Sequence, residues 1–354
     1  MADKNDQDQE VGENSFAIQS GRDTNIGLSP EQMGVILEAL AKQLPAYTAV
    51  ARQIVDDRLE KFEERLILRF TTDENANSEA FKDPDFQSLL TRGQHAYARS
   101  GDEMIQETLV DLIVERSKHG KRSRLSLSLN DAVEKSALLT VNEFAEITLI
   151  FSIHHVRIIN WVSPESLGRF LSDTAGELLP FIENTTSSYA YMQSLGCGSL
   201  NNITSLPFGD VFNDRFRLVF SPPHMIENVA QRLGQQLLDF LIANDLIKRF
   251  NPENVSEVRF DACSHIEFAQ RLAATSLDQE DQNKIKVLVE EGLPTVEDFR
   301  KAVTDVFPKF EQLKAAWDDT PINKFTLTTT GIAIGHTNFY RLSKLSPPLS
   351  IWIQ

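Results

Sequence analysis

The sequence has few of the features that tie a chain to a membrane or to an oxidising compartment. Cys197 and Cys263 are its only two cysteines, which excludes a disulfide framework and is typical of a reducing cytoplasm. The N-terminus, MADKNDQDQE, has neither a basic nor an apolar run, so we expect no signal peptide. Ala145–Val162 is the most apolar stretch, yet its histidines and charged residues make it too polar to span a bilayer. We therefore expect a cytoplasmic protein in which this stretch is a buried helix.

Positive charge is also scarce. Lysine and arginine number 35 against 51 aspartates and glutamates, which gives a formal net charge of −16 at pH 7. Such a chain is repelled by phosphate backbones and by anionic lipid surfaces, so we expect neither membrane binding nor broad nucleic-acid binding. Tyrosine and tryptophan are few, whereas phenylalanine occurs 22 times, a balance that favours core packing over aromatic recognition.

Two short strands are predicted near the N-terminus, after a polar segment, 1–13, that we expect to be disordered. In the leader, 14–28, the apolar residues Phe16, Ile18 and Ile26 share one parity, and a glycine and an aspartate separate the two halves. Alternation with period two around a turn predicts a pair of strands. Because two strands alone are marginal in water, we expect further strands, most simply from other copies of the chain.

A long helix is predicted over residues 29–72, with Ser29 as a suitable N-cap and Pro30 as a suitable first residue. Apolar residues then recur at alternating spacings of three and four as far as Ile54, as in a coiled coil, and Pro45 predicts a kink. We expect this seam to bring copies of the chain together; the alternative is a helix that packs on its own body. The predicted oligomerisation residues of leader and seam are Ile18, Ile26, Leu37, Leu40, Leu44, Tyr47 and Ile54.

Residues 81–354 are predicted to form a mainly helical body with minor strands. Thr140 with Glu143 marks one helix start as a capping box, and the Gly-, Ser- and Asn-rich stretch Asn184–Phe220 predicts loops and short strands. The predicted helices include Val141–Trp161, Ser166–Leu179, His224–Ala243 and Thr295–Leu313. Strands are predicted at Val255–Asp261 and Leu349–Ile353, and a strand followed by a helix within Phe325–Arg341.

One dense cluster of positive charge, Arg116–Arg124, interrupts the acidic chain. A phosphate or nucleic-acid contact through Lys121, Arg122 and Arg124 is one interpretation. The alternative, which we favour, is a solvated loop between helices, because no aromatic residues interleave the charges as single-strand binding would need. A nucleic-acid partner is therefore not expected.

Two short patterns contain metal-binding or nucleophilic residue types. His154 and His155 are adjacent, so on a helix they point about 100° apart and do not easily chelate one ion. Cys263 and His265 combine a thiol with an imidazole, but no third group nearby would orient the base or complete a metal site. The sequence therefore predicts no catalytic residue, no metal ligand and no cofactor.

Two further motifs carry a resemblance. The leader Asn14-Ser-x-x-Ile-Gln-x-Gly-x-Asp-x-x-Ile26, followed by Gly-Leu-Ser and the long helix, resembles a leader of uncharacterised bacterial proteins, several of which occur in mobile-element or phage-defence settings. The ending Leu327-Thr-x-x-Gly-x-x-Ile-Gly335, with a closing Leu-Ser-Ile-Trp-Ile, is similar to the tail of one such family. The resemblance implies a bacterial cytoplasmic protein of unknown function, and it implies no activity.

The predicted fold is mainly α, with a short N-terminal β leader, a long coiled-coil-like helix and a larger helical C-terminal body with minor strands. The function that we expect is a non-enzymatic oligomeric scaffold or sensor whose body recognises a protein or a ligand, with a link to phage defence implied by the resemblance. The alternative is an effector enzyme with an active site assembled from distant residues in the 184–265 region, since catalytic residues favour loops on a scaffold. A nucleic-acid sensor that acts through the basic loop is a third, weaker interpretation.

Overall fold

The computed structural model describes residues 30–201, 207–251, 254–345 and 347–354. The described chain is mainly helical with a few short strands, which confirms the predicted fold class. The predicted β leader at 14–28, with Ile18 and Ile26, lies outside the described residues. The chain divides into two units, Met1–Asp57 and Arg58–Gln354.

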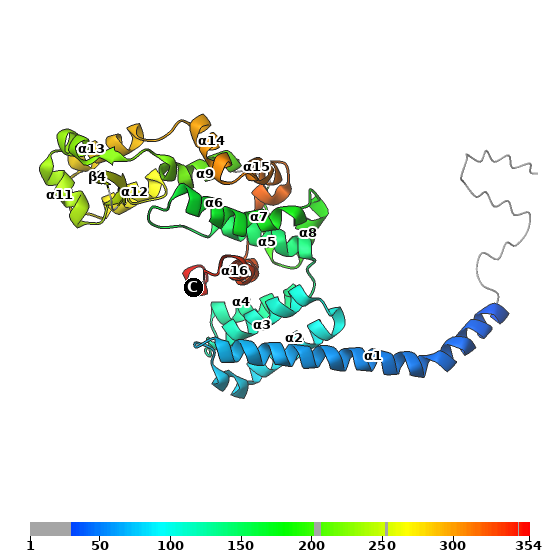
Figure 1. The fold of residues 1–354 in the computed structure, drawn as a ribbon. Helices are drawn as coiled ribbons and strands as arrows, with labels where there is room; N and C mark the ends of the chain where they lie inside the picture. Colours follow the sequence, from blue (N-terminus) through cyan, green and yellow to red (C-terminus); the bar gives the residue numbers. More distant parts are fainter. Residues whose placement is uncertain (1–29, 202–206, 252–253, 346) are drawn as a thin grey trace, which may run out of the picture. The chain divides into compact units, whose positions relative to one another are not determined.

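Helix α1, Pro30–Thr72, confirms the predicted long helix. It contains Pro45, which has no amide donor and crowds the preceding turn, and the ribbon bends in this N-terminal part (Figure 1). In the second unit the same helix contributes Phe62 and Leu66 to a hydrophobic core, where both side chains are buried. Among the described residues, the C-terminal part of α1 is therefore part of the core of the second unit.

The first hydrophobic core joins helices from the beginning and the end of the second unit. Its helices include α2 (Pro84–Ser100), α3 (Glu103–Ser117), α4 (Arg124–Ser136), α5 (Val141–His154) and α16 (Thr329–Ser343). Helix α5 is mostly apolar and is buried on every side, as Ile147 and Leu149, which point to opposite faces, illustrate. Thr140 and Glu143 form the predicted capping box at its start, with the Thr140 amide donating to the Glu143 carboxylate at 2.8 Å.

Close packing of α16 explains the two glycines of the C-terminal motif. Thr328 is the N-cap of this helix, and its hydroxyl oxygen accepts a hydrogen bond from the Gly331 amide. A Cβ on Gly331 would lie 2.0 Å from the carbonyl oxygen of Cys197, and a Cβ on Gly335 would lie 2.7 Å from the Cβ of Phe151. Both positions therefore need glycine because α16 approaches the chain around it too closely for any side chain.

Helices of the middle of the chain extend the same core. They are α6 (Pro164–Asp173), α7 (Ala175–Leu178), α8 (Thr186–Ser194), α9 (Phe208–Phe216), α14 (Val296–Val306) and α15 (Phe310–Asp318). Phe208 stacks on Phe212 and also contacts Trp317, so aromatic packing joins α9 to α15. Strands β1 (Gly198–Leu200) and β5 (Phe325–Leu327) pair antiparallel, with Gly198 opposite Leu327.

A second hydrophobic core surrounds a three-stranded antiparallel sheet. The sheet has the order β2 (His224–Met225), β4 (Asn254–Phe260), β3 (Ile247–Asn251), and β4 confirms the strand predicted at Val255–Asp261. The helices around it are α10 (Ile226–Leu233), α11 (Gln235–Ala243), α12 (His265–Ala273) and α13 (Gln279–Glu291) (Figure 1). Leu241, Phe260 and Ile285 lie in this core.

Several predicted elements are wrong in extent. The helix predicted at Val141–Trp161 ends at His154, and Asn160 takes a φ of 70° that a helix excludes. The helix predicted at His224–Ala243 begins with strand β2 and is broken at Gly234, whose φ is 87°. Three breaks divide the predicted segments, at Thr174, at Gly234 and at Phe307, which precedes a proline and leaves the helical conformation.

Two predictions are wrong in type. Asn184–Phe220, predicted as loops and short strands, contains strand β1 but also helices α8 and α9, because apolar residues such as Tyr189 and Phe212 are fully packed despite their irregular spacing. The strand predicted at Leu349–Ile353 is a short 3₁₀ helix, Leu349–Ile351. Within the described segments, no helix combines the length and apolar character that crossing a membrane requires.

Candidate functional site

The N-terminal half of α1 carries an exposed apolar face. The exposed fractions are 61% for Leu44, 55% for Tyr47 and 44% for Ile54. Val50 and Val55, which flank the seam on the helical wheel, are also exposed. Apolar side chains this accessible to water gain free energy when another surface covers them, so this face is a candidate interaction surface.

The structure describes only part of the predicted oligomerisation set. Leu44, Tyr47 and Ile54 are exposed as stated, whereas the side chains of Leu37 and Leu40 and all of Ile18 and Ile26 lie outside the described residues. The described part of the seam is free of charge, because no residue from Gln43 to Ala51 is ionisable except the Tyr47 phenol. No like-charge repulsion within that stretch would oppose the pairing of two identical helices.

A change of register separates the seam from the buried stripe of α1. The seam positions Tyr47, Ala51 and Ile54 would continue to residues 58 and 61, but the buried residues are Phe62 and Leu66. The heptad register of the seam therefore does not continue into the buried stripe, and the sequence shows this as a phase shift.

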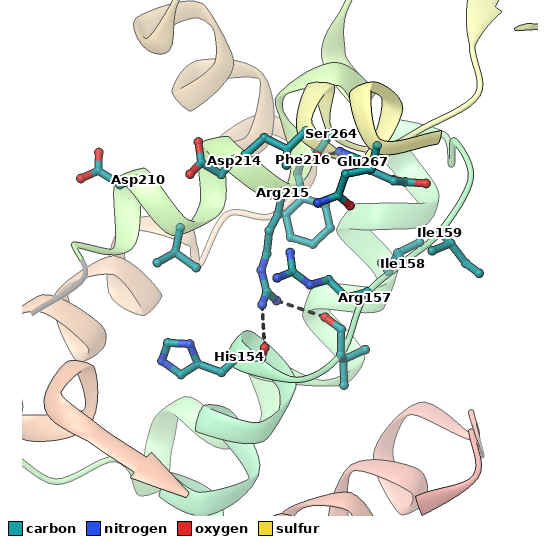
Figure 2. A pocket seen from close by; sticks show the side chains of 14 residues that line it. His154, Arg157, Ile158, Ile159, Asp210, Asp214, Arg215, Phe216, Ser264 and Glu267 are labelled. Atoms are coloured by element: carbon teal, nitrogen blue, oxygen red, sulfur yellow. Dashed lines mark hydrogen bonds between the residues drawn. The ribbon is translucent and has the colours of Figure 1, made fainter. Parts of the chain in front are cut away.

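A pocket of about 480 Å³ opens where α5 ends (Figure 2). Its walls come from residues 154–159, from α9 and from the start of α12. The ring of Phe216 and the side chains of Ile158 and Ile159 supply apolar surface, while Arg157 and Arg215 supply positive charge. The pocket therefore gathers residues from segments that are distant in the sequence.

Arg215 has a structural task in this pocket. Its guanidinium donates to the carbonyl oxygens of His154 at 3.0 Å and Val156 at 3.1 Å, two of the groups left without helical partners where α5 ends. Burial, followed by the positive charge of Arg157, lowers the pKa of Arg215 to about 10. Because these donors bond to the backbone, the main role of Arg215 is to cap the end of α5, and it is less available than Arg157 to bind a ligand.

Arg157 is the cation that is available to a ligand. Figure 2 shows its guanidinium beside that of Arg215, whereas the side chains of Asp210 and Asp214 point away from both. Among the described residues no carboxylate forms an ion pair with Arg157. Burial, followed by Arg215, lowers the pKa of the nearby His154 to about 4, so this imidazole is neutral at pH 7. The arrangement offers an anion a guanidinium and a neutral ring.

The thiol and imidazole of the Cys263–His265 pattern do not form a reactive pair. Cys263 is buried, its Sγ lies 3.0 Å from the carbonyl oxygen of Asn160, and burial followed by Glu267 raises its pKa to about 12. Glu267 itself accepts from the amides of Cys263 and Asn160 and so holds the loop. Burial likewise raises the pKa of the second thiol, Cys197, to about 11. Neither thiol has the lowered pKa of a nucleophile.

The basic loop is partly consumed by bonds within the chain. Arg116 is buried and donates to Asp85 at 2.9 Å, and Lys118 bridges Asp73 and Glu115. The predicted phosphate contacts Lys121, Arg122 and Arg124 are exposed, with no ion pair to the described residues. A phosphate contact through these three cations stays a prediction, and the strongly acidic chain opposes it.

The remaining pattern, His154–His155, is packed against aromatic rings. His154 lies against Trp317 with ring centroids 5.0 Å apart, and His155 stacks on Phe151 at 5.6 Å. No group of three or more His, Cys, Asp or Glu side chains is placed to hold a metal ion in the described part of the chain. The sequence analysis did not single out Arg157 and Arg215 as site residues. No local motif distinguishes them, because their position in the pocket depends on where α5 ends.

Of the comparisons with known proteins, one gives a match. A model of an uncharacterised protein family matches residues 27–353. The matched range contains the C-terminal motif Leu327–Gly335, whereas the leader motif ends at Ile26, just before the range begins. No curated protein and no solved structure matches the chain.

Proposed function

The chain belongs to an uncharacterised protein family, and we propose that it is a non-enzymatic scaffold that assembles copies of itself through the N-terminal half of α1. The observation that carries this proposal is the exposed, uncharged apolar seam. Covering a large apolar side chain is worth on the order of 1 kcal/mol or more. Leu44, Tyr47, Val50 and Ile54 together therefore offer several kcal/mol to a partner that fits them.

A second copy of the same helix fits this seam. Spacings of three and four let the side chains of one helix pack between those of an identical neighbour. If Leu44 and Ala51 occupy the a positions, Tyr47 and Ile54 occupy the d positions. Pro45 then falls at a b position, outside the seam, so its ring would not obstruct pairing. The leader at 14–28, with Ile18 and Ile26, would extend the same interface.

The seam can be tested by a pair of matched substitutions. We expect the combined variant Leu44→Asp and Ile54→Asp to reduce the mass of the full chain in solution from that of an oligomer to the 39.9 kDa of one copy, because each copy would bury two added charges in the interface. The control Ala49→Asp adds a charge to the opposite, exposed side of the same helix and should leave the oligomer intact. Light scattering coupled to size exclusion at micromolar concentration measures the mass.

Two outcomes would overturn this scaffold function. One is a wild-type chain with the mass of a single copy throughout the micromolar range. The other is a double variant with an unchanged mass. Because Leu44 and Ile54 are exposed, the body should keep its helical circular dichroism in the variant, which separates loss of assembly from loss of folding.

An effector enzyme with its active site in the 184–265 region is the second candidate. The observation in its favour is that the pocket in Figure 2 takes residues from α9 and from Ser264, both in this region or at its edge. Against it stand the buried Cys263 thiol and the neutral His154. Turnover that is lost in Arg157→Ala while the oligomer persists would favour the enzyme.

A role in phage defence, implied by the leader motif, would be supported by defence genes beside this one.

A further inference from the structure

A smaller, mostly apolar pocket of about 230 Å³ lies between α3, α5, α7 and α16. Phe144 and Leu178 form buried walls. Met104, Val141 and Phe181 surround the mouth and are exposed, although each is a large apolar residue. An apolar cavity with an apolar mouth favours an apolar ligand.

One wall of this pocket contains two buried donors without acceptors. Asn338 is 8% exposed, and its Oδ1 accepts hydrogen bonds from the Thr108 hydroxyl at 3.0 Å and from Nη2 of Arg341. These bonds identify the other amide atom as Nδ2, which has no hydrogen-bond partner among the described residues. Nε of Arg341 is likewise buried without a hydrogen bond, and it lies 3.7 Å from Oδ2 of Asp111, which also lacks one. A buried donor left unpaired costs about 1–3 kcal/mol, so an acceptor that reached it would stabilise the protein.

Two guanidiniums beside this wall share one carboxylate. Asp111 lies 2.6 Å from Arg69 and 3.7 Å from Arg341. The neighbouring Arg65 is paired with Glu107 at 2.5 Å. Arg341 therefore has no carboxylate of its own. The remaining acidic group of the pocket, Glu177, is exposed.

We propose that this pocket binds a small apolar carboxylic acid, with its carboxylate at Asn338 and Arg341 and its hydrocarbon part among Phe144, Leu178 and Phe181. The carboxylate would accept from Nδ2 of Asn338 and would share the Arg341 guanidinium with Asp111. The hydrocarbon part would cover the apolar walls. A neutral ligand of the same length would cover the apolar walls but would lack the carboxylate contacts.

Octanoate and octan-1-ol separate these contributions on the full chain. Isothermal titration calorimetry should show octanoate binding at least tenfold more tightly than octan-1-ol, and octanoate should raise the unfolding temperature. Asn338→Asp keeps the size of the side chain but replaces the unpaired donor with a carboxylate that pairs with Arg341. This variant should bind octanoate at least tenfold more weakly while remaining folded. Asn283→Asp, on the exposed side of α13, makes the same charge change elsewhere and should bind as the wild type does.

Phe181→Glu provides a second test at the mouth, where the side chain is exposed. The added negative charge should also weaken octanoate binding by at least tenfold. Equal affinities for octanoate and octan-1-ol, unchanged octanoate affinity in both pocket variants, or no octanoate binding up to millimolar concentration would each overturn the proposal.

Discussion

Glu146 is a carboxylic acid with no exposed surface, located on the buried helix α5. Its carboxyl oxygens accept from the Ser188 hydroxyl at 2.9 Å and from the Glu183 amide at 3.4 Å. Burial raises the pKa of Glu146 to about 7, and the Ser188 hydrogen bond offsets only part of this effect. The folded protein therefore holds a proton here that the unfolded chain releases near pH 4.5.

This proton makes stability depend on pH. Between pH 4.5 and 7 the folded state binds more protons than the unfolded state, so the free energy of unfolding falls as pH rises, by about 3 kcal/mol in total. Glu146→Gln removes the titration, and the Ser188 hydroxyl can turn to accept from the new amide. The variant should match the wild type at pH 4.5 and exceed it by up to about 3 kcal/mol at pH 8, measured by urea unfolding. Parallel stability curves for the two proteins would contradict this assignment; Glu290→Gln, exposed on α13, is the control.

At the scale of the element, α16 depends on the absence of a side chain at Gly331. Gly331→Ala would force a Cβ to within 2.0 Å of the Cys197 carbonyl oxygen, and a backbone atom cannot move aside as a flexible side chain can. We expect a loss of about 2–4 kcal/mol in the free energy of unfolding. Gly209→Ala in α9 meets no atom within 4 Å and should change stability by less than about 1 kcal/mol. Chemical denaturation of both variants tests the contrast; equal stabilities would show that α16 can shift.

The starts of helices could be predicted, but their ends could not. Thr140 acts as the predicted N-cap, and Ser163 and Thr295 cap α6 and α14 in the same way, because each bonds to an amide within the next turn, so the signal is local. The end of α5 depends instead on Arg215, which lies 61 positions after His154, and nothing near residue 154 announces it. Helices α8 and α9 were not predicted for the same reason, because their aromatic residues are buried by segments that are distant in the sequence.

At the scale of the whole molecule, net charge opposes assembly. Each copy carries −16 at pH 7, so copies repel one another when salt is low. The Debye length falls from about 30 Å at 0.01 M to about 8 Å at 0.15 M ionic strength. Self-association through the uncharged seam should therefore strengthen several-fold as sodium chloride rises from 10 to 300 mM, measured by sedimentation velocity. Weaker association at high salt would point to an interface held by opposite charges instead.

The candidate sites were predictable to different degrees for the same reason. The seam of α1 is periodic, so its spacing alone predicts an apolar face at Leu44, Tyr47 and Ile54. The pocket at Asn338 and Arg341 arises from α3, α5, α7 and α16 together, and no short stretch of sequence shows that two donors will lack acceptors. Periodic features are visible in a sequence, whereas sites formed by tertiary contacts are not.

The packing of α16 against α5 has a consequence for biosynthesis. Arg341 donates to Thr108 across 233 positions of the chain, and Gly335 lies against Phe151. Helices α3 and α5 therefore complete their packing only after α16 has been synthesised. Because the N-terminal end of a chain leaves the ribosome first, the surfaces of α3 and α5 that α16 covers stay open to water and to neighbouring nascent chains until translation is nearly finished. A premature stop codon shortly before residue 329 would thus be expected to yield an aggregating product rather than a shortened working protein.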